Sequence, residues 1–207
     1  VGSEMCIRDR VEKLVKVYKN TKVDAQMLKD ADVDAVILAI GSSPITIKLE
    51  GMDKLQHASA PEVLRHEVCP KGKVAVIGGG LVGLETADTL ATDGCDVTVL
   101  EMKDEIGSDL GSLRKIAVMM KLQQMQVKML PNSKVCKFTE EGIVLEDETL
   151  VPCNCAVFAV GFASNDSHLL VEECEKRQIP CRVIGDAKSA RRALDAIAEG
   201  FEAARTL

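Results

Sequence analysis

Short runs of almost continuously apolar residues recur along the chain, and most of them stop at a glycine. Continuous apolarity with β-branched residues over about six positions is typical of strands buried on both faces of a sheet. The predicted strands are Asp34–Gly41, Lys73–Ile77, Asp96–Met102, Ala156–Gly161 and Cys181–Ile184. Helical patterns lie between several of these runs, and strands that alternate with helices predict an α/β fold with a parallel, doubly wound sheet.

The other segments carry weaker patterns. The predicted helices are Leu81–Asp93, most of residues 111–130 (with Gln126–Leu130 favouring the next strand) and Ser189–Arg205. A hairpin is predicted around Glu141–Val151, where an acidic turn separates two apolar stretches. Loose alternation of valines indicates a strand within residues 11–19. Residues 42–72 show no long period and hold three of the six prolines, so we interpret them as a connector between two units.

Composition narrows the class of protein. The 207 residues have a formal net charge of −6 and few aromatic side chains, whereas a nucleic-acid binder carries a basic surface and aromatic platforms for stacking. No apolar run approaches the roughly 18 residues of a membrane span, so no membrane association is expected. Eight cysteines without a signal peptide are too sparse for a secreted disulfide scaffold, which predicts reduced thiols and a cytoplasmic location.

A glycine-rich turn carries the strongest chemical signal. Gly78, Gly80 and Gly83 form the pattern G-x-G-x-x-G between a predicted strand and a predicted helix, and Glu101 closes the next strand 18 residues after Gly83. In such a unit the first glycine allows a tight turn, the second lets a pyrophosphate approach, and the third lets the helix pack on the sheet. The sequence therefore predicts a dinucleotide site. A glycine-rich turn that binds nothing is the alternative.

Glu101 also bears on which nucleotide would bind. A carboxylate at this strand end can accept hydrogen bonds from both ribose hydroxyls and would repel a 2′-phosphate, which favours NAD(H) over NADP(H). Lys103 lies nearby and would soften that preference. Glu85, early in the predicted helix, fits either a cofactor contact or a carboxylate favoured by the helix dipole alone.

Two smaller motifs flank this unit. Ala39-Ile40-Gly41 and Ala159-Val160-Gly161 end two predicted strands in nearly the same way, and Gly185-Asp186 precedes the last helix. Around a central G-x-G-x-x-G, this order resembles flavoproteins of the pyridine nucleotide-disulfide oxidoreductase type, in which a Rossmann-like NAD(P)-binding domain is inserted in an FAD-binding domain. The phrases KVAVIGGGLVGLETADTL, DVTVLEM, AVGF and VIGDAKSARRALDAIAEGFEAA resemble more narrowly the C-terminal region of NADH:flavin oxidoreductases related to old yellow enzyme, which include 2-enoate and 2,4-dienoyl-CoA reductases.

The resemblance implies roles for these residues. Gly78, Gly80, Gly83 and Glu101 match positions that bind NAD(H). Ala39, Gly41, Ala159 and Gly161 match the strand-end turns beside the cofactors, and Gly185 and Asp186 match an FAD motif. It also implies hydride transfer from NADH to FAD, in a parent enzyme that reduces activated C=C bonds. We name no catalytic acid or base and no metal ligand in this chain.

The chain departs from the family pattern at its start. Nothing before residue 34 supplies the glycine-rich turn that opens an FAD domain, so we expect a truncated FAD domain. FMN, an iron–sulfur cluster and the barrel that would hold the FMN are expected only in a missing N-terminal part, because the cysteines here show no cluster spacing. Cys153 and Cys155 are expected to serve packing. The first residue is Val1 rather than Met, which also favours a fragment.

Four segments summarise the expected organisation. Residues 1–10 (VGSEMCIRDR) resemble a translated sequencing-adaptor scar and are treated as a non-native tail, with a native disordered tail as the alternative. Residues 11–70 end the first FAD segment and form the connector, residues 71–154 form the NAD domain, and residues 155–207 form the FAD return segment. A stand-alone NAD-binding module without redox turnover is the alternative function. The sequence does not define the substrate or the oligomeric state.

Overall fold

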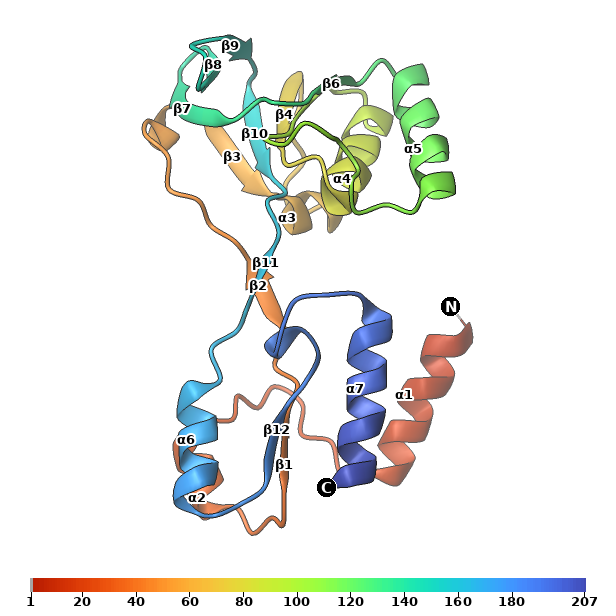
Figure 1. Cartoon of the computed structure of the whole chain (residues 1–207), viewed down its shortest axis with the longest axis vertical. Coiled ribbons are helices and arrows are strands. Elements are labelled where there is room, and N and C mark those ends of the chain that lie inside the picture. The colour runs from red at the N-terminus through yellow and green to blue at the C-terminus, as the bar shows by residue number, and fades with distance from the viewer. Residues whose placement is uncertain (1) are drawn as a thin grey trace. The chain divides into compact units, whose positions relative to one another are not determined.

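The chain forms two compact units. A computed structural model describes residues 2–207, except for the side chains of residues 2–6 and 8; Val1 of the expected tail lies outside the described residues. The first unit comprises the chain up to Ile40 and the segment from Asn165 to Leu207, and the second comprises Gly41–Ser164 (Figure 1). The second unit is thus inserted between the two segments of the first.

A five-stranded parallel sheet organises the second unit. In spatial order its strands are β3 (Gln56–Ser59), β10 (Cys155–Phe158), β4 (Lys73–Ile77), β5 (Asp96–Leu100) and β6 (Lys128–Leu130). Each neighbouring pair runs parallel, with Ile77 opposite Leu100 on one side of β4 and opposite Phe158 on the other. From β4 the chain moves outward to β5 and β6 and then returns to the opposite side of β4 as β10. The order therefore reverses between β4 and β10, and ligands of open α/β sheets bind at such a reversal.

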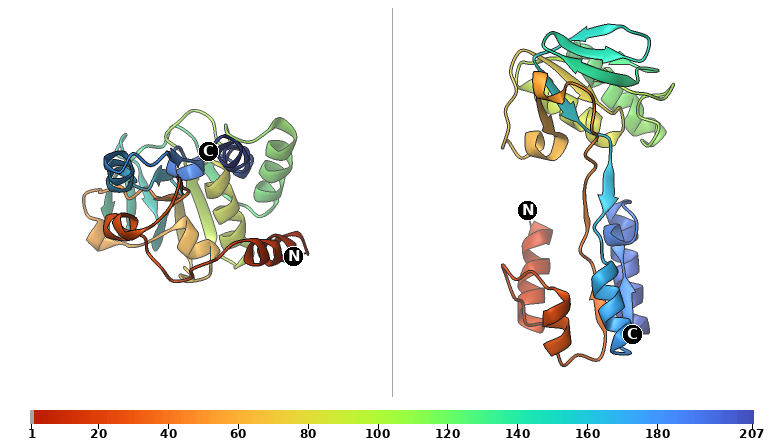
Figure 2. Two further views of the ribbon diagram at one scale, coloured as in Figure 1. Left: turned by 90° about the horizontal axis from the view of Figure 1, so that it is seen from below. Right: turned by 90° about the vertical axis from the view of Figure 1, so that its left-hand side faces the viewer.

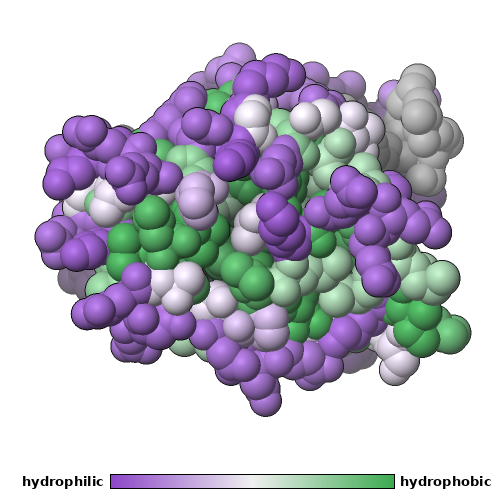
Figure 3. Space-filling view, turned by 90° about the horizontal axis from the view of Figure 1, so that it is seen from above, coloured by the Kyte–Doolittle hydropathy of each residue, from purple (hydrophilic) through white to green (hydrophobic). Residues whose placement is uncertain are grey.

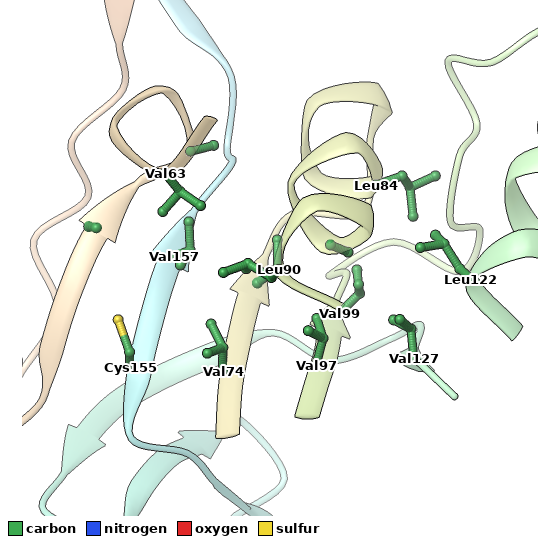
Figure 4. Packing of buried hydrophobic residues seen from close by; sticks show 14 of the residues in the cluster. Val63, Val74, Leu84, Leu90, Val97, Val99, Leu122, Val127, Cys155 and Val157 are labelled. Atoms are coloured by element: carbon green, nitrogen blue, oxygen red, sulfur yellow. The ribbon is translucent and has the colours of Figure 1, made fainter. Parts of the chain in front are cut away.

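Helices cover one face of this sheet. They are α3 (Ala60–Leu64), α4 (Leu81–Thr92) and α5 (Ser112–Gln124). The helices and the sheet share a core that includes Val74, Leu84, Leu90, Val97 and Val99, each 1% exposed or less (Figure 4). Full burial of one such side chain is worth about 1.5–3 kcal/mol relative to exposure, so this face supplies much of the stability of the unit.

An antiparallel meander covers the other face. Its strands are β7 (Val135–Thr139), β8 (Gly142–Leu145) and β9 (Leu150–Pro152). The three strands lie across the sheet from the helices (Figure 2). Phe138 and Ile143 of the meander pack against Ala75 and Ile77 of β4, while Val74 and Val76 of β4 face the helices. Strand β4 is continuously apolar after Lys73 because both of its faces are buried.

The face seen in Figure 3 carries hydrophobic side chains toward its middle and polar side chains around them.

A two-stranded ribbon and a short helical turn complete the second unit. Strand β2 (Ser42–Pro44) pairs with β11 (Phe162–Ser164) in an antiparallel ribbon, and η1 (Met52–Lys54) precedes β3. The connector predicted for residues 42–72 therefore contains regular structure, and β3 within it is a strand of the main sheet. Its sequence, Gln-His-Ala-Ser, has no apolar run, because an edge strand is held by backbone pairing with β10 rather than by burial on both faces.

The first unit contains a small two-stranded sheet. Its elements are α1 (Gly2–Leu14), α2 (Ala25–Asp30), β1 (Val36–Leu38), α6 (His168–Lys176), β12 (Cys181–Val183), η2 (Gly185–Ala187) and α7 (Ala193–Thr206). Strand β1 pairs with β12 in parallel. Arg177, which follows α6, donates hydrogen bonds from its guanidinium to the Leu28 and Ala31 carbonyl groups at the end of α2, the latter over 2.9 Å. That contact ties α6 to α2.

Two expectations for the first unit are wrong. Val11–Leu14 belong to α1 rather than to a strand, and residues 15–24 form no helix or strand. Strand β1 is not buried on both faces: Ile37 is 41% exposed, because β12 is the one strand that pairs with β1 among the described residues.

Among the described residues, no helix has the length and apolarity needed to cross a membrane.

Candidate nucleotide-binding site

The glycine-rich turn joins β4 to α4 at the point where the strand order reverses. The Gly78 amide donates a hydrogen bond of 2.8 Å to the Leu100 carbonyl oxygen, and Gly78 has a left-handed φ of +109°. A Cβ atom on Gly78 would lie 2.4 Å from the Ala159 carbonyl oxygen, and one on Gly83 would lie 1.9 Å from the Gly78 carbonyl oxygen. The turn, the helix and the end of β10 therefore approach one another more closely than any side chain would allow.

The Glu101 carboxylate holds this turn in place through hydrogen bonds to backbone amides. Its Oε2 accepts a hydrogen bond of 2.7 Å from the Gly79 amide, and its Oε1 accepts one of 2.9 Å from the Lys103 amide. The sequence indicated a ribose acceptor but not this backbone role. A carboxylate has about four lone-pair sites, so both oxygens keep acceptor capacity for ribose hydroxyls.

Asp109 is a site residue that the sequence did not reveal. It lies in the loop between β5 and α5, and its Oδ1 and Oδ2 accept hydrogen bonds of 3.1 and 3.0 Å from the Leu81 amide at the start of α4. A Cβ atom on Gly80 would lie 3.1 Å from Oδ2. Because the contact spans 28 positions, no local motif around the glycines announces it.

A cavity of about 510 Å³ opens beside the turn. This lies within the range of roughly 300–1,000 Å³ typical of small-molecule and cofactor sites. Gly78, Gly80, Glu101, Ala159 and Gly161 all line it, so the structure brings these predicted residues together. Further lining residues that the sequence did not indicate include Leu49, Ser133, Lys134 and Val135. The cavity combines apolar walls with a small set of polar groups at the turn.

The remaining predicted residues of the second unit have other surroundings. Gly41 has a φ of +73° with open space where a Cβ would lie. The Gly161 carbonyl oxygen accepts a hydrogen bond of 3.0 Å from the Ile45 amide. Glu85 forms an ion pair of 2.8 Å with Arg114 of α5, which gives its carboxylate a partner within the protein.

Ala39, Gly185 and Asp186 lie in the first unit. Ala39 follows β1, and Gly185 and Asp186 follow β12 in η2, so the three residues stand at the carboxyl ends of two paired strands. The Gly185 amide donates a hydrogen bond of 2.7 Å to Oε2 of Glu199 on α7. A hydrogen bond from Arg191 and this amide together lower the pKa of the Glu199 carboxyl to about 2. Asp186 Oδ1 accepts a hydrogen bond of 3.2 Å from the Arg191 amide.

The cysteine pair near β10 is buried, as packing residues would be. Cys153 is 5% exposed and Cys155 is 1% exposed. Burial raises the pKa of each thiol to about 11. Neither thiol is thus available as a thiolate near neutral pH.

The fold and the turn together define an α/β unit of the Rossmann-like class, inserted between the two segments of the other unit. The chain matches the pyridine nucleotide-disulphide oxidoreductase family over residues 3–186, and it belongs to that family. Its members are oxidoreductases that bind FAD and NAD(H). The predicted fold class, an α/β Rossmann-like domain, is confirmed.

Curated relatives extend the comparison. The chain is 36% identical over 191 residues to a bilirubin reductase of Mediterraneibacter gnavus, covering 89% of this chain and 29% of that protein. It is 34% identical over 201 residues to a cinnamate reductase of Clostridium sporogenes, covering 93% of this chain and 29% of that protein. A 2-naphthoyl-CoA reductase structure shares the fold with a TM-score of 0.85 at 24% identity, covering 97% of this chain and 31% of that one. The chain thus spans about three-tenths of the length of these proteins.

Proposed function

We propose that the second unit binds NAD(H) with its pyrophosphate at the glycine-rich turn, and that Glu101 selects against NADP(H). The cavity of about 510 Å³ beside the turn carries this proposal, because Gly78, Gly80 and Glu101 line it together where the strand order reverses. The α4 amides and the positive end of the helix dipole would receive the phosphates. The Glu101 carboxylate, held by the Gly79 and Lys103 amides, would meet the ribose at a fixed position.

FAD is the second cofactor of the proposal. The first unit would contribute Ala39, Gly185 and Asp186 to it, and the helix dipole that follows Gly185 would favour negative charge on a reduced flavin. The adenine and pyrophosphate half of FAD does not fit the described residues of this unit, which hold β1 and β12 but no second glycine-rich strand–turn–helix. When bound, the two cofactors would supply hydride transfer from the nicotinamide to the flavin, and the role of this chain's residues would be to bind and orient the two rings.

The whole enzyme would reduce activated C=C bonds. The cinnamate reductase similarity supports this substrate class, and the chain's coverage of 29% of that protein leaves ample length for the rest. We propose that a further part of the same polypeptide, related to old yellow enzyme, supplies an FMN-binding barrel and an iron–sulfur cluster. In this proposal residues 71–154 serve NAD(H), residues 11–70 and 155–207 serve FAD, residues 1–10 are foreign to the protein, and the enzyme is cytoplasmic.

Nucleotide titration tests the first part. NADH binding to the purified chain, followed by nicotinamide fluorescence, is expected to be saturable and tighter than NADPH binding. Glu101→Arg should shift preference toward NADPH, since the guanidinium pairs with a 2′-phosphate. Asp104→Arg, an equal change of charge in the same loop, is the matched control and should leave the preference unchanged. Glu101→Gln keeps an acceptor for the turn and should weaken NADH binding without a gain for NADPH.

Two results would contradict the proposal. If Glu101→Arg discriminates between NADH and NADPH as the unchanged protein does, Glu101 does not select the nucleotide. If the chain retains FAD tightly through purification, the first unit is not a truncated FAD site. A chain that binds NADH yet gives no flavin reduction even when joined to its upstream coding region would instead favour the stand-alone NAD-binding module.

A further inference from the structure

The position expected for a phosphate group is held by a side chain of the protein itself. Both carboxylate oxygens of Asp109 lie within 3.1 Å of the Leu81 amide nitrogen, which is the first helical amide of α4. The space over Gly80, which a pyrophosphate needs, is bordered by Asp109 Oδ2 at 3.1 Å from an ideal Cβ position. Asp109 also lines the same cavity as Gly78 and Glu101.

The loop that carries Asp109 is anchored on the turn. The Gly107 amide donates a hydrogen bond of 2.8 Å to the Gly79 carbonyl oxygen. Ile106, 6% exposed, packs so closely that a Cβ atom on Gly79 would lie 3.2 Å from its side chain. Glu105 of the same loop pairs with Lys115 of α5 at 2.5 Å. These contacts hold Asp109 beside α4, so its carboxylate has a high local concentration at the helix end.

We propose that Asp109 is an internal competitor for the nucleotide pyrophosphate, and that it sets the affinity of the site. This inference rests on the proposed NAD(H) site. A carboxylate and a phosphate use the same donor, the Leu81 amide, and two anions at one helix end repel each other. Binding therefore requires the Asp109 side chain to leave the amide. If the nucleotide binds only molecules in which the Leu81 amide is vacant, its apparent dissociation constant equals the intrinsic one divided by the fraction of such molecules. The smaller that fraction, the weaker the observed binding.

The magnitude follows from the difference between charged and neutral hydrogen bonds. A bond to an ionised group is worth about twice a neutral one. Asp109→Asn keeps the size and an acceptor oxygen but removes the charge. Asp109→Asn is expected to tighten NADH binding about five- to ten-fold. Asp109→Ala removes the competing side chain altogether and is expected to tighten NADH binding at least as much. Inorganic pyrophosphate should follow the same order as a competitor of NADH, because it probes the anion position alone.

Asp104→Asn is the matched control. It removes one negative charge from the same loop without touching the turn, so a general change of electrostatic potential would affect both variants alike. The expected result is tighter NADH and pyrophosphate binding for Asp109→Asn, with Asp104→Asn within a factor of two of the unchanged protein. Equal tightening in both variants, or weaker binding in Asp109→Asn and Asp109→Ala, would overturn the proposal.

A second measurement covers variants that fail to fold. In the unchanged protein, the nitrogen and proton resonances of the Leu81 amide should shift on saturation with pyrophosphate, together with the carboxyl carbon resonance of Asp109. NADH that binds while the Asp109 carboxyl resonance stays fixed would refute the competition but leave the NAD(H) site intact. Absence of NADH binding in every protein, including the unchanged one, would refute the proposed function instead.

Discussion

Gly83→Ala tests the packing that defines the nucleotide turn. The added Cβ would lie 1.9 Å from the Gly78 carbonyl oxygen, 3.0 Å from its carbonyl carbon and 3.4 Å from the Ala159 Cβ. Gly78 cannot give way easily, since its amide is bonded to Leu100 at 2.8 Å and its own Cα faces the Ala159 carbonyl oxygen. Relief therefore requires α4 to move from the sheet by about 1.5 Å, if contacts below about 3.4 Å are to be removed.

That movement would loosen a well-packed core. Leu84 and Ala87 of α4 are 0% exposed, and Leu90 is 1% exposed. Overpacking of a core typically costs about 1–3 kcal/mol of stability. Because the added Cβ would clash with a backbone atom rather than with a movable side chain, we expect Gly83→Ala to lower the free energy of unfolding by about 3 kcal/mol or more. Because dinucleotide folds in general accept either glycine or alanine at this position, the expectation is specific to the geometry of this chain.

Urea unfolding followed by far-ultraviolet circular dichroism measures the effect. Gly111→Ala, at the start of α5, is the control: its φ is −66° and no atom lies within 4 Å of the added Cβ. We expect the control to change the free energy of unfolding by less than about 1 kcal/mol. The reasoning would be refuted if the free energy of unfolding of Gly83→Ala lies within about 1 kcal/mol of that of the unchanged chain and the variant binds NADH equally well.

Three further outcomes are expected. Iodoacetamide at pH 8 should label the exposed Cys136 and spare Cys155, because burial raises the pKa of the Cys155 thiol to about 11; mass spectrometry of peptides reads both, and labelling of Cys155 in the native protein would contradict its burial. Glu199→Gln should reduce the acid sensitivity of the first unit. The pKa of Glu199 is depressed from 4.5 to about 2, mainly by Arg191, so its stabilisation is present above pH 4.5 and lost as the pH falls toward 2. If Glu199→Gln and the unchanged chain give identical acid-unfolding curves, Glu199 does not contribute this stabilisation. Gly200→Ala should stabilise α7 by about 0.5–1 kcal/mol in thermal unfolding, since the nearest atom to the added Cβ is 3.7 Å away; a lowered melting temperature would show an unseen clash.

The sequence predicted best where both faces of an element are buried. Lys73–Ile77 was expected as a strand and forms β4 with the same bounds, because helices cover one face and the meander covers the other. The expected glycine positions also coincide with the close approaches at Gly78 and Gly83. Their cofactor roles stay predictions.

Elements held by backbone pairing or by distant contacts were not predictable in this way. Strand β3 has no apolar pattern, since its place at the sheet edge depends on hydrogen bonds to β10. The contact of Asp109 with the Leu81 amide depends on the path of a loop that no periodicity describes. The end of helix α1 at Leu14, between Val11 and Val15, was not predictable either, because the spacing of these valines fits a loose alternation but does not mark the end of a helix.

The double hydrogen bond of Glu101 has a consequence for how this unit could change its cofactor over evolution. One carboxylate both accepts a hydrogen bond from the Gly79 amide and lines the cavity proposed to hold the nucleotide. If Glu101 selects the nucleotide as proposed, one substitution to a cationic residue would remove the hydrogen bond to the Gly79 amide in the same step that changes the nucleotide preference. A lineage that moved to the phosphorylated nucleotide would therefore loosen its glycine-rich turn in the same step, and a second acceptor for the Gly79 and Lys103 amides would be expected to follow as compensation.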